Sequence, residues 1–268
     1  MPQTEPNPAS SDHFLNLVGA RLVPTLASRT TARDLRNAIT ARAVICVHGG
    51  VGLGKTLAVR TNLRDLAPQT TVPLSFRKGA GVTTLCEILY QALDLPGETP
   101  TKVTAVDDRL CEALEAQPRV LVCDEAQGLS TKALDHLRTL WGEDGSPRFT
   151  LVLVGGENCH QRVRSRAALA SRIAIWQQYK PLQPAEILQV MPQYHALWTD
   201  VPPDDLLWVD TLICHGNFRN WAKTTYHLQE ALHEDGAPDH FTRDLMRSVL
   251  DSLDSTVRTT GQAVPGYL

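Results

Sequence analysis

A loop with four glycines, GGVGLG, separates an apolar segment from a helix-forming segment at residues 44–60, VICVHGGVGLGKTLAVR. The stretch from Gly49 to Thr56 matches the pattern GxxxxGK(S/T), in which backbone N–H groups cradle phosphates. A chance match in a glycine-rich turn is the alternative. The flanking segments argue against it, because the pattern requires a buried strand before the loop and a helix after it. The loop therefore predicts a nucleotide site and restricts the chain to folds that can hold one.

The chemistry expected of this loop depends on its last residues. Lys55 can reach the β- and γ-phosphates, and Thr56 can hold Mg²⁺ through its hydroxyl. The helix that begins there adds its positive N-terminal end. ATP and Mg²⁺ are the expected cofactors. The nucleotide-binding residues predicted here are Gly49, Gly50, Val51, Gly52, Leu53, Gly54, Lys55, Thr56 and Leu57.

A second motif supplies two carboxylates at the end of another apolar strand, in the segment VLVCDE at residues 120–125. In P-loop enzymes the first acid holds Mg²⁺, which assigns this role to Asp124, and Glu125 is placed to polarise the attacking water. An acidic turn after a strand is common, and is the alternative. The distance in sequence from Thr56 argues against it, because it leaves room for two further β-α units.

The pattern around these motifs alternates apolar strands with helices of about ten residues, which is typical of an α/β domain with a mainly parallel sheet. The strands are apolar throughout, as expected when helices cover both faces of the sheet. The expected strands are 43–47, 72–76, 120–123, 149–154 and 173–176, and the expected helices are 13–42, 56–66, 83–93, 106–116, 131–141 and 162–171.

Strand signals fade after Pro181, and four further helices are expected at 184–198, 204–213, 217–234 and 238–253. The 268 residues, 43% of them hydrophobic, suffice for a core domain with a small appendage. The expected organisation is a disordered lead (1–12), a P-loop ATPase core with an N-terminal linker helix (13–180), a helical lid domain (181–253) and a flexible tail (254–268).

Charge and cysteine content narrow the class of protein. The formal net charge of −3 neither requires nor excludes a nucleic-acid partner, so such a partner would need a local basic patch. The six cysteines form no CxxC pair, which fits a reduced, cytoplasmic protein without a zinc ribbon. Cys159-His160 and Cys214-His215 could suggest metal ligands, but unrelated residues near element ends explain them better. No apolar run approaches the ~20 residues of a membrane span.

The order of motifs resembles the AAA+ ATPases and, within them, the transposition regulators TnsC, TniB and MuB. It runs from the P-loop through the strand with Asp-Glu, a strand with a glycine pair and an arginine-rich helix to a helical lid. The resemblance spans about residues 20 to 235 and implies an AAA+ P-loop domain whose parallel sheet is sandwiched by helices, plus a small C-terminal helical lid domain. It also implies that Val23 and Pro24 flank the adenine.

The same resemblance implies two arginines that act on phosphate. The segment ALASRI is similar to the one that carries the arginine finger, so Arg172 would reach the γ-phosphate of a neighbouring subunit. The segment HGNFR is similar to sensor 2, so Arg219 would contact phosphate from the lid. A solvated or ion-paired arginine is the alternative for each. The predicted catalytic residues are Lys55, Glu125, Arg172 and Arg219.

One position departs from the family pattern. Relatives place Thr or Asn directly after a glycine as sensor 1, and here that position is Gly156. Asn158 is the better substitute than Glu157, because a neutral amide can bind water and phosphate at once. The departure leaves open a scaffold that binds ATP but barely hydrolyses it.

Contact with the backbone of double-stranded DNA is expected at Arg77 and Lys78, in the segment where relatives track DNA. An ordinary basic loop is the alternative. One subunit offers few such contacts, so useful affinity requires a homo-oligomer, a ring or a helical filament, that repeats them.

The whole pattern predicts an oligomerising, DNA-binding ATPase of the cytoplasm, without a membrane partner, that regulates a transposase and its choice of target site. The transposase role rests on resemblance alone. Another ATP-driven switch, such as a secretion or defence NTPase, remains the alternative.

Overall fold

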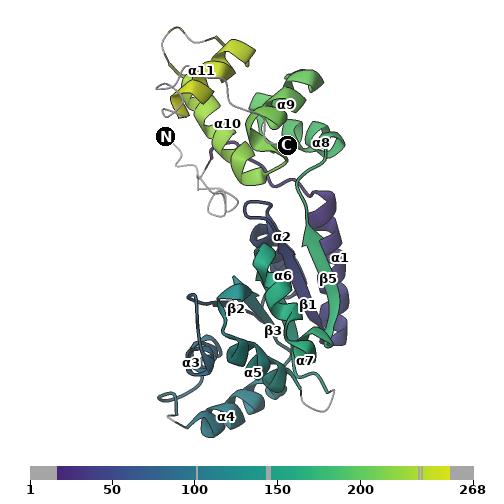
Figure 1. Cartoon of the computed structure of the whole chain (residues 1–268), viewed down its shortest axis with the longest axis vertical. Coiled ribbons are helices and arrows are strands. Elements are labelled where there is room, and N and C mark those ends of the chain that lie inside the picture. The colour runs from purple at the N-terminus through teal and green to yellow at the C-terminus, as the bar shows by residue number, and fades with distance from the viewer. Residues whose placement is uncertain (1–16, 101, 143–145, 235, 237, 254–268) are drawn as a thin grey trace, which may run out of the picture. The chain divides into compact units, whose positions relative to one another are not determined.

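The computed structural model describes residues 17–100, 102–142, 146–234, 236 and 238–253 (Figure 1). The chain forms two compact units: Pro24–Lys180, and Pro181–Leu268 together with Met1–Val23. The first unit is called the sheet unit below, and the second the helical unit. The predicted lead (1–12) and tail (254–268) lie outside the described residues.

The sheet unit contains a five-stranded, all-parallel sheet in the order β2-β3-β4-β1-β5. This confirms the predicted α/β class. The register pairs Val47 with Val154 and Cys123 with Leu153, so β3, β4 and β1 end close together. The strands are β1 (Val44–Gly49), β2 (Thr71–Ser75), β3 (Val120–Asp124), β4 (Thr150–Gly155) and β5 (Ile173–Tyr179).

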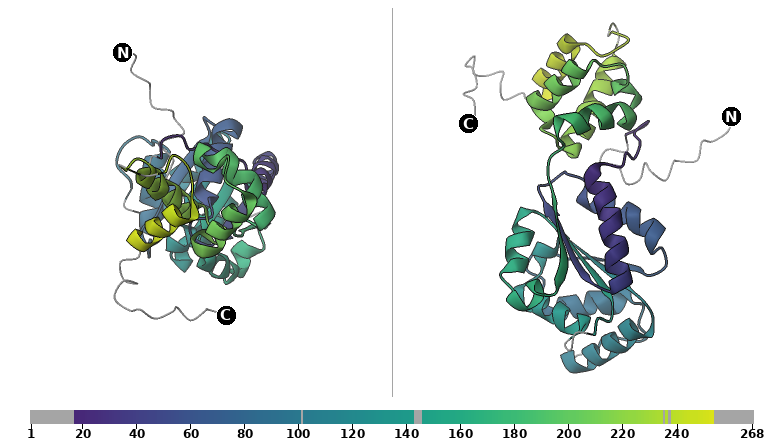
Figure 2. Two further views of the ribbon diagram at one scale, coloured as in Figure 1. Left: turned by 90° about the horizontal axis from the view of Figure 1, so that it is seen from above. Right: turned by 90° about the vertical axis from the view of Figure 1, so that its right-hand side faces the viewer.

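Helices cover both faces of this sheet because alternate strand residues enter two separate cores. Val44 and Cys46 of β1 belong to the core formed with α3, α4, α5 and α6, whereas Ile45 and Val47 belong to the core formed with α1 and α2. The right-hand view of Figure 2 shows purple α1 on one side of the sheet. The helices are α1 (Leu26–Ala41), α2 (Lys55–Leu66), α3 (Val82–Ala92), α4 (Val103–Ala116), α5 (Thr131–Trp141), α6 (Glu157–Arg164) and α7 (Ala167–Ala170).

The helical unit packs its helices around a tryptophan pair. The rings of Trp198 and Trp221 meet edge to face with centroids 5.1 Å apart, and both are fully buried. Leu17 and Val23 from the N-terminal segment pack into the same core. The elements are α8 (Pro184–Tyr194), a 3₁₀ turn (Ala196–Trp198), α9 (Pro203–Val209), a π turn (Asp210–Cys214), α10 (Phe218–Leu232) and α11 (Arg243–Leu253).

The N-terminal segment corrects the prediction of a helix over residues 13–42. Residues 17–25 are not helical, and the helix begins at Leu26, where Thr25 Oγ1 caps it by accepting from Ser28 N at 3.1 Å. Pro24 explains the boundary, because a proline disfavours helical backbone at the residue before it. Instead of continuing a helix, the segment binds the helical unit, where Arg21 N donates to Tyr194 O at 2.8 Å.

Other boundaries also differ from the sequence predictions. The helix expected at 162–171 is two helices, α6 beginning at Glu157 and the short α7. The strand expected at 173–176 continues to Tyr179, because β5 pairs with the whole of β1. The two units divide at Lys180–Pro181 and a second time at Val23–Pro24, where no boundary was expected.

Candidate functional site

The candidate site lies at the carboxyl ends of β1, β3 and β4, which are neighbours in the sheet. β1 ends at Gly49 and β3 ends at Asp124, so the glycine loop and the acidic pair leave the sheet at the same edge. In open α/β sheets, ligands bind in the crevice beyond these ends. The sheet order therefore joins two motifs that are far apart in the sequence.

Two glycines of the loop hold conformations that other residues rarely adopt. Gly49 has a φ of +144°, and a Cβ there would collide with the backbone carbonyl of Tyr179. Gly54 has a φ of +87° directly before α2, and a Cβ there would meet no atom within 4 Å. The loop is thus tight against β5 at its start and open where the positive end of α2 begins, as a phosphate cradle requires.

Lys55 is the first residue of α2, and its side chain folds back over the loop. Its Nζ donates to the carbonyl oxygens of Gly49 at 2.9 Å and Gly50 at 2.6 Å, and the residue is only 8% exposed. A buried ammonium must be paired or hydrogen-bonded, and here the loop carbonyls do this. The cation is thereby held inside the curve of the loop, where a phosphate would meet it.

Thr56 and Asp124 meet across the site. Thr56 Oγ1 donates to Asp124 Oδ1 at 3.1 Å, and the same oxygen accepts from Glu125 N at 3.0 Å. A hydroxyl and a carboxylate oxygen side by side are hard ligands of the type that Mg²⁺ takes together with phosphate oxygens. This donor set therefore fits Mg²⁺ bound with a nucleotide.

Gln127 holds the second acid. Glu125 is exposed, with a backbone φ of +51°, and its Oε2 accepts from Gln127 Nε2. The other end of the same amide accepts from Gly156 N at 3.2 Å. Gln127 thus bridges the end of β4 and the predicted catalytic acid. It was not assigned a role from the sequence, and the only signal there is its place two residues after Glu125.

Gly155, the last residue of β4, makes room for this bridge. A Cβ on Gly155 would collide with Gln127 Oε1 and lie 2.5 Å from Cys159 Cβ. Asn158, the sensor 1 candidate, is exposed on the first turn of α6. The side-chain amide that reaches Gly155 and Gly156 therefore comes from Gln127. The role of Asn158 stays a prediction.

Arg172 lies at the amino ends of β5 and β1, whereas the glycine loop of the same chain follows the carboxyl end of β1. It is exposed and directly precedes Ile173, which pairs with Val44 at the start of β1, whereas Gly49 ends that strand. The structure does not bring Arg172 to the phosphate loop of the same chain. Its role as an arginine finger in a neighbouring copy stays a prediction.

The predicted DNA residues lie beside the acidic pair. Arg77 and Lys78 are exposed in the turn after β2. This turn is fixed, because the N–H groups of Gly79 and Ala80 both donate to Gly128 O, at 2.7 and 3.1 Å. Gly128 ends the 3₁₀ turn Ala126–Gly128, which carries Gln127. The basic turn and the segment that holds Glu125 are therefore joined by hydrogen bonds.

The remaining predicted residues belong to the helical unit or its boundary. Val23 is partly buried against the helical core, and Pro24 is exposed as the first residue of the sheet unit. Arg219 is exposed on the first turn of α10, which Asn217 caps by accepting from Arg219 N at 3.0 Å. The roles of these three residues in nucleotide binding stay predictions.

An aromatic cluster beside the loop was not expected from the sequence. His48, directly before Gly49, is buried, and its ring centroid lies 4.5 Å from that of His160. Trp176 packs edge-on against His160, and the Arg164 guanidinium lies 4.9 Å from the centre of the indole ring. Burial lowers the pKa of His48 below its ordinary value, and the charges of His160, Lys55 and Arg164 lower it further. The neutral form of the imidazole next to the loop is therefore favoured.

Residues 39–163 match the family described as AAA domain. Over that segment the chain is similar to this AAA domain family. Over 144 residues it is 29% identical to the Mu-like prophage FluMu DNA transposition protein B of Haemophilus influenzae, a match that covers 53% of this chain and 48% of the relative. The chain thus aligns with about half the length of that relative. This similarity confirms the resemblance to the MuB-like group.

Solved structures support the fold. The Cdc6 protein of Pyrobaculum aerophilum superposes with a TM-score of 0.69 at 16% identity, covering 87% of this chain and 68% of that one. Orc1 of Aeropyrum pernix, solved in complex with DNA, gives a TM-score of 0.61 at 15% identity, covering 89% and 69%. The Holliday junction branch migration motor RuvB of Thermotoga maritima gives 0.56 at 15%, covering 85% and 68%. At these identities the likeness shows the AAA+ fold alone.

Within the described residues, no helix combines the length and the apolar character needed to traverse a bilayer.

Proposed function

We propose that this AAA+ protein is an ATPase that assembles on double-stranded DNA with ATP and regulates a transposase and its choice of target. The observation that carries the proposal is the meeting of Thr56 and Asp124 at 3.1 Å, with Glu125 next to them. Phosphoryl transfer needs a phosphate cradle, ligands for a metal ion and a group that positions water. The similarity to a transposition protein supports the choice of partner.

Each residue of the site has one part in the proposed hydrolysis. Lys55 binds the β- and γ-phosphates from inside the loop, and the N-terminus of α2 adds N–H donors. Thr56 and Asp124 would hold Mg²⁺, which neutralises developing charge on the phosphates. Glu125, held by Gln127, orients the attacking water and polarises it.

Assembly follows from the position of Arg172. Stabilising the charge of the transition state requires a cation close to the γ-phosphate, and an arginine finger supplied by a neighbour does this in related systems. Because Arg172 lies at the end of the strands opposite to its own glycine loop, it would act in a neighbouring copy. Arg219 would contact phosphate from the helical lid. ATP then favours a ring or a helical filament, and hydrolysis releases it.

DNA contact is proposed at Arg77 and Lys78. Both residues are exposed. Backbone hydrogen bonds join their turn to Gly128, the last residue of the 3₁₀ turn Ala126–Gly128. Contacts to phosphates position a protein without reading sequence, which suits a regulator that must accept many targets. An assembly repeats the two cations along the duplex, so affinity grows with the number of subunits and falls with salt.

The proposal is tested by measuring ATP turnover with and without duplex DNA, and ATP-dependent assembly on that DNA by imaging. We expect DNA to stimulate turnover, and Glu125→Gln to bind ATP and stay assembled on DNA. Glu112→Gln, the same chemical change on the exposed face of α4, serves as the matched control. If Glu125→Gln stays monomeric with ATP and DNA, the proposal that ATP drives assembly and hydrolysis releases it is wrong. If DNA neither stimulates turnover nor shows an ATP-dependent shift, the proposed binding to DNA is wrong.

An ATP-binding scaffold with little hydrolysis is the second candidate. Glu125 already accepts a hydrogen bond from Gln127, so one of its carboxylate oxygens is occupied by a side chain rather than by water. This candidate predicts tight ATP binding, assembly on DNA and negligible turnover under all conditions. Single-turnover measurement of phosphate release distinguishes the two.

A further inference from the structure

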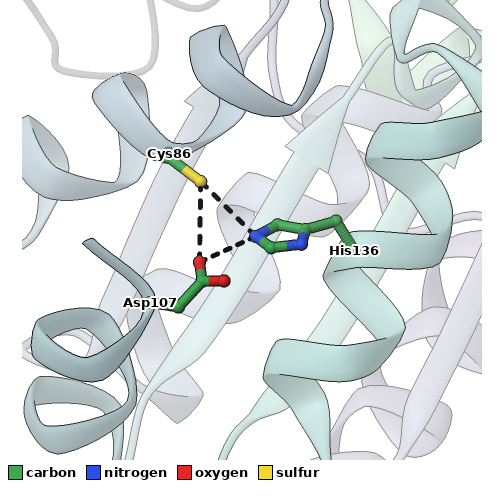
Figure 3. A group of neighbouring side chains, drawn as sticks. All are labelled: Cys86, Asp107 and His136. Atoms are coloured by element: carbon green, nitrogen blue, oxygen red, sulfur yellow. Dashed lines mark hydrogen bonds and ion pairs between the residues drawn. The ribbon is translucent and has the colours of Figure 1, made fainter. Parts of the chain in front are cut away.

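Three side chains with metal-binding atoms converge on the face of the sheet unit that α3, α4 and α5 cover (Figure 3). Cys86 comes from α3, Asp107 from α4 and His136 from α5, and they are called the Cys–Asp–His cluster below. Their ligand atoms all lie within 4.8 Å of one another. Within the described part of the chain, no other group of three or more such residues comes together in this way.

The spacing of the three atoms matches the edges of a tetrahedral zinc site. His136 Nε2 lies 2.9 Å from Asp107 Oδ1 and 3.5 Å from Cys86 Sγ, and Cys86 Sγ lies 3.9 Å from Asp107 Oδ1. Zinc bonds of ~2.3 Å to sulfur and ~2.0–2.1 Å to nitrogen and oxygen, at tetrahedral angles, put these atoms about 3.3–3.6 Å apart. A shift of a few tenths of an ångström would seat the ion.

The geometry differs from that of a catalytic Cys-His-Asp triad. A triad uses one ring nitrogen for the nucleophile and the other for the acid. Here the single atom His136 Nε2 faces both Cys86 and Asp107, as Figure 3 shows, so the ring cannot relay a proton between them. Three atoms aimed at one point suit a cation instead.

We propose that Cys86, Asp107 and His136 bind one Zn²⁺ ion, with solvent as the fourth ligand. Thiolate and imidazole select zinc over Mg²⁺, which prefers oxygen ligands only. Solvent can reach the fourth position, because the side chains of His136 and Asp107 are 14% and 27% exposed. The ion would tie together three helices that are otherwise joined at this point by weak polar contacts. This site does not depend on the proposed ATPase activity.

The test adds Zn²⁺ or Co²⁺ alone to the full chain after treatment with a chelator. With Co²⁺ we expect a thiolate-to-metal charge-transfer band and the visible bands of a four-coordinate ion, at one ion per chain. Cys86→Ser should abolish the first band. Asp107→Asn and His136→Gln should weaken binding at least ~10–100-fold, since even outer-shell partners of a metal site are worth that much. Cys111→Ser and Asp108→Asn, on α4 beside the cluster, are the matched controls and should bind normally.

A melting curve gives the second measurement. Zn²⁺ at ~100-fold excess over its dissociation constant should raise the Tm of the native sequence by about 5–10 °C, and that of Cys86→Ser by far less. Circular dichroism checks that the variants fold. The proposal fails if the charge-transfer band is absent, if it survives in Cys86→Ser, or if the control variants lose it equally. None of these outcomes bears on ATP turnover, which separates failure here from failure of the proposed function.

Discussion

Replacing Gln127 by alanine should slow hydrolysis without preventing ATP binding. Gln127 contacts Glu125 and Gly156, but neither the glycine loop nor the Thr56–Asp124 pair depends on its side chain. Its loss would remove the hydrogen bond that, among the described residues, fixes the direction of the Glu125 carboxylate. The perturbation therefore acts on the positioning of the proposed base alone.

The size of the effect follows from the two hydrogen bonds. A hydrogen bond to a charged group contributes about 1.5–3 kcal/mol, and the exposure of Glu125 places this one at the lower end. If about 1.5 kcal/mol of positioning is lost in the transition state only, turnover falls roughly tenfold. The bond to Gly156 N is neutral and contributes about 1 kcal/mol to local stability instead.

Steady-state ATP hydrolysis at saturating DNA is the assay, with kcat and KM determined separately. We expect Gln127→Ala to lower kcat about tenfold and to change the KM for ATP less than about twofold, the pattern of an interaction realised only in the transition state. Asn158→Ala is the matched comparison, because it removes the amide that was the substitute candidate for sensor 1 and that is exposed on α6. Its kcat should stay within about twofold of the native value.

The opposite ranking would refute this reasoning. If Asn158→Ala lowers kcat and Gln127→Ala does not, the amide that senses phosphate is Asn158, and the Gln127 bridge is only structural. A fall in kcat together with a matching rise in KM would show that Gln127 supports ATP binding rather than the transition state.

Three further predictions concern the glycine loop, the histidine beside it and Arg172. Gly49→Ala should lower the free energy of unfolding by about 1–3 kcal/mol, visible as a lower Tm, because the new methyl collides with the backbone of β5; an unchanged Tm would contradict the tight approach. The lowered pKa of His48 means that the unfolded chain binds a proton first as the pH falls, so stability should decrease below about pH 6.5. His48→Gln should flatten this slope in urea unfolding between about pH 7.5 and 5, and an equal slope in both proteins would exclude His48 as its source. Arg172→Ala and Lys55→Ala should each lack turnover, and mixing the two should restore part of it if the arginine acts between subunits; no recovery would argue against action in trans.

The glycine loop and the acidic pair could be predicted because their constraints are local. Each is a short segment whose backbone and strand context are set by neighbours in sequence, and parallel pairing of β1, β4 and β3 then brings Asp124 to Thr56. The alternation of elements predicted the sheet and its two helical layers for the same reason. Errors appear where tertiary contacts decide, as at residues 17–25, where Leu17 and Val23 pack into the helical unit rather than extending α1.

Contacts between distant segments had no signal in the sequence. Cys86, Asp107 and His136 come from three helices without any regular spacing, so a search for paired cysteines passes over them. Cys159 and His160 were better explained from the sequence as unrelated residues than as metal ligands, but their neighbours could not be predicted. The structure places Cys159 in the core and His160 against His48. Only the fold shows which neighbours a side chain has.

The same limit explains why the connection between the basic turn at Arg77 and Lys78 and the acid Glu125 was not predicted. Gly79 and Ala80 donate to Gly128 O, and Gln127, one residue earlier, holds Glu125. Gly128 fits closely there, since a Cβ on it would lie 3.3 Å from Phe76 O. A phosphate bound at the basic turn would therefore pull on the short segment that aims the proposed base, without any contact to the nucleotide itself. If DNA stimulates turnover, this chain of hydrogen bonds offers a route by which it can do so.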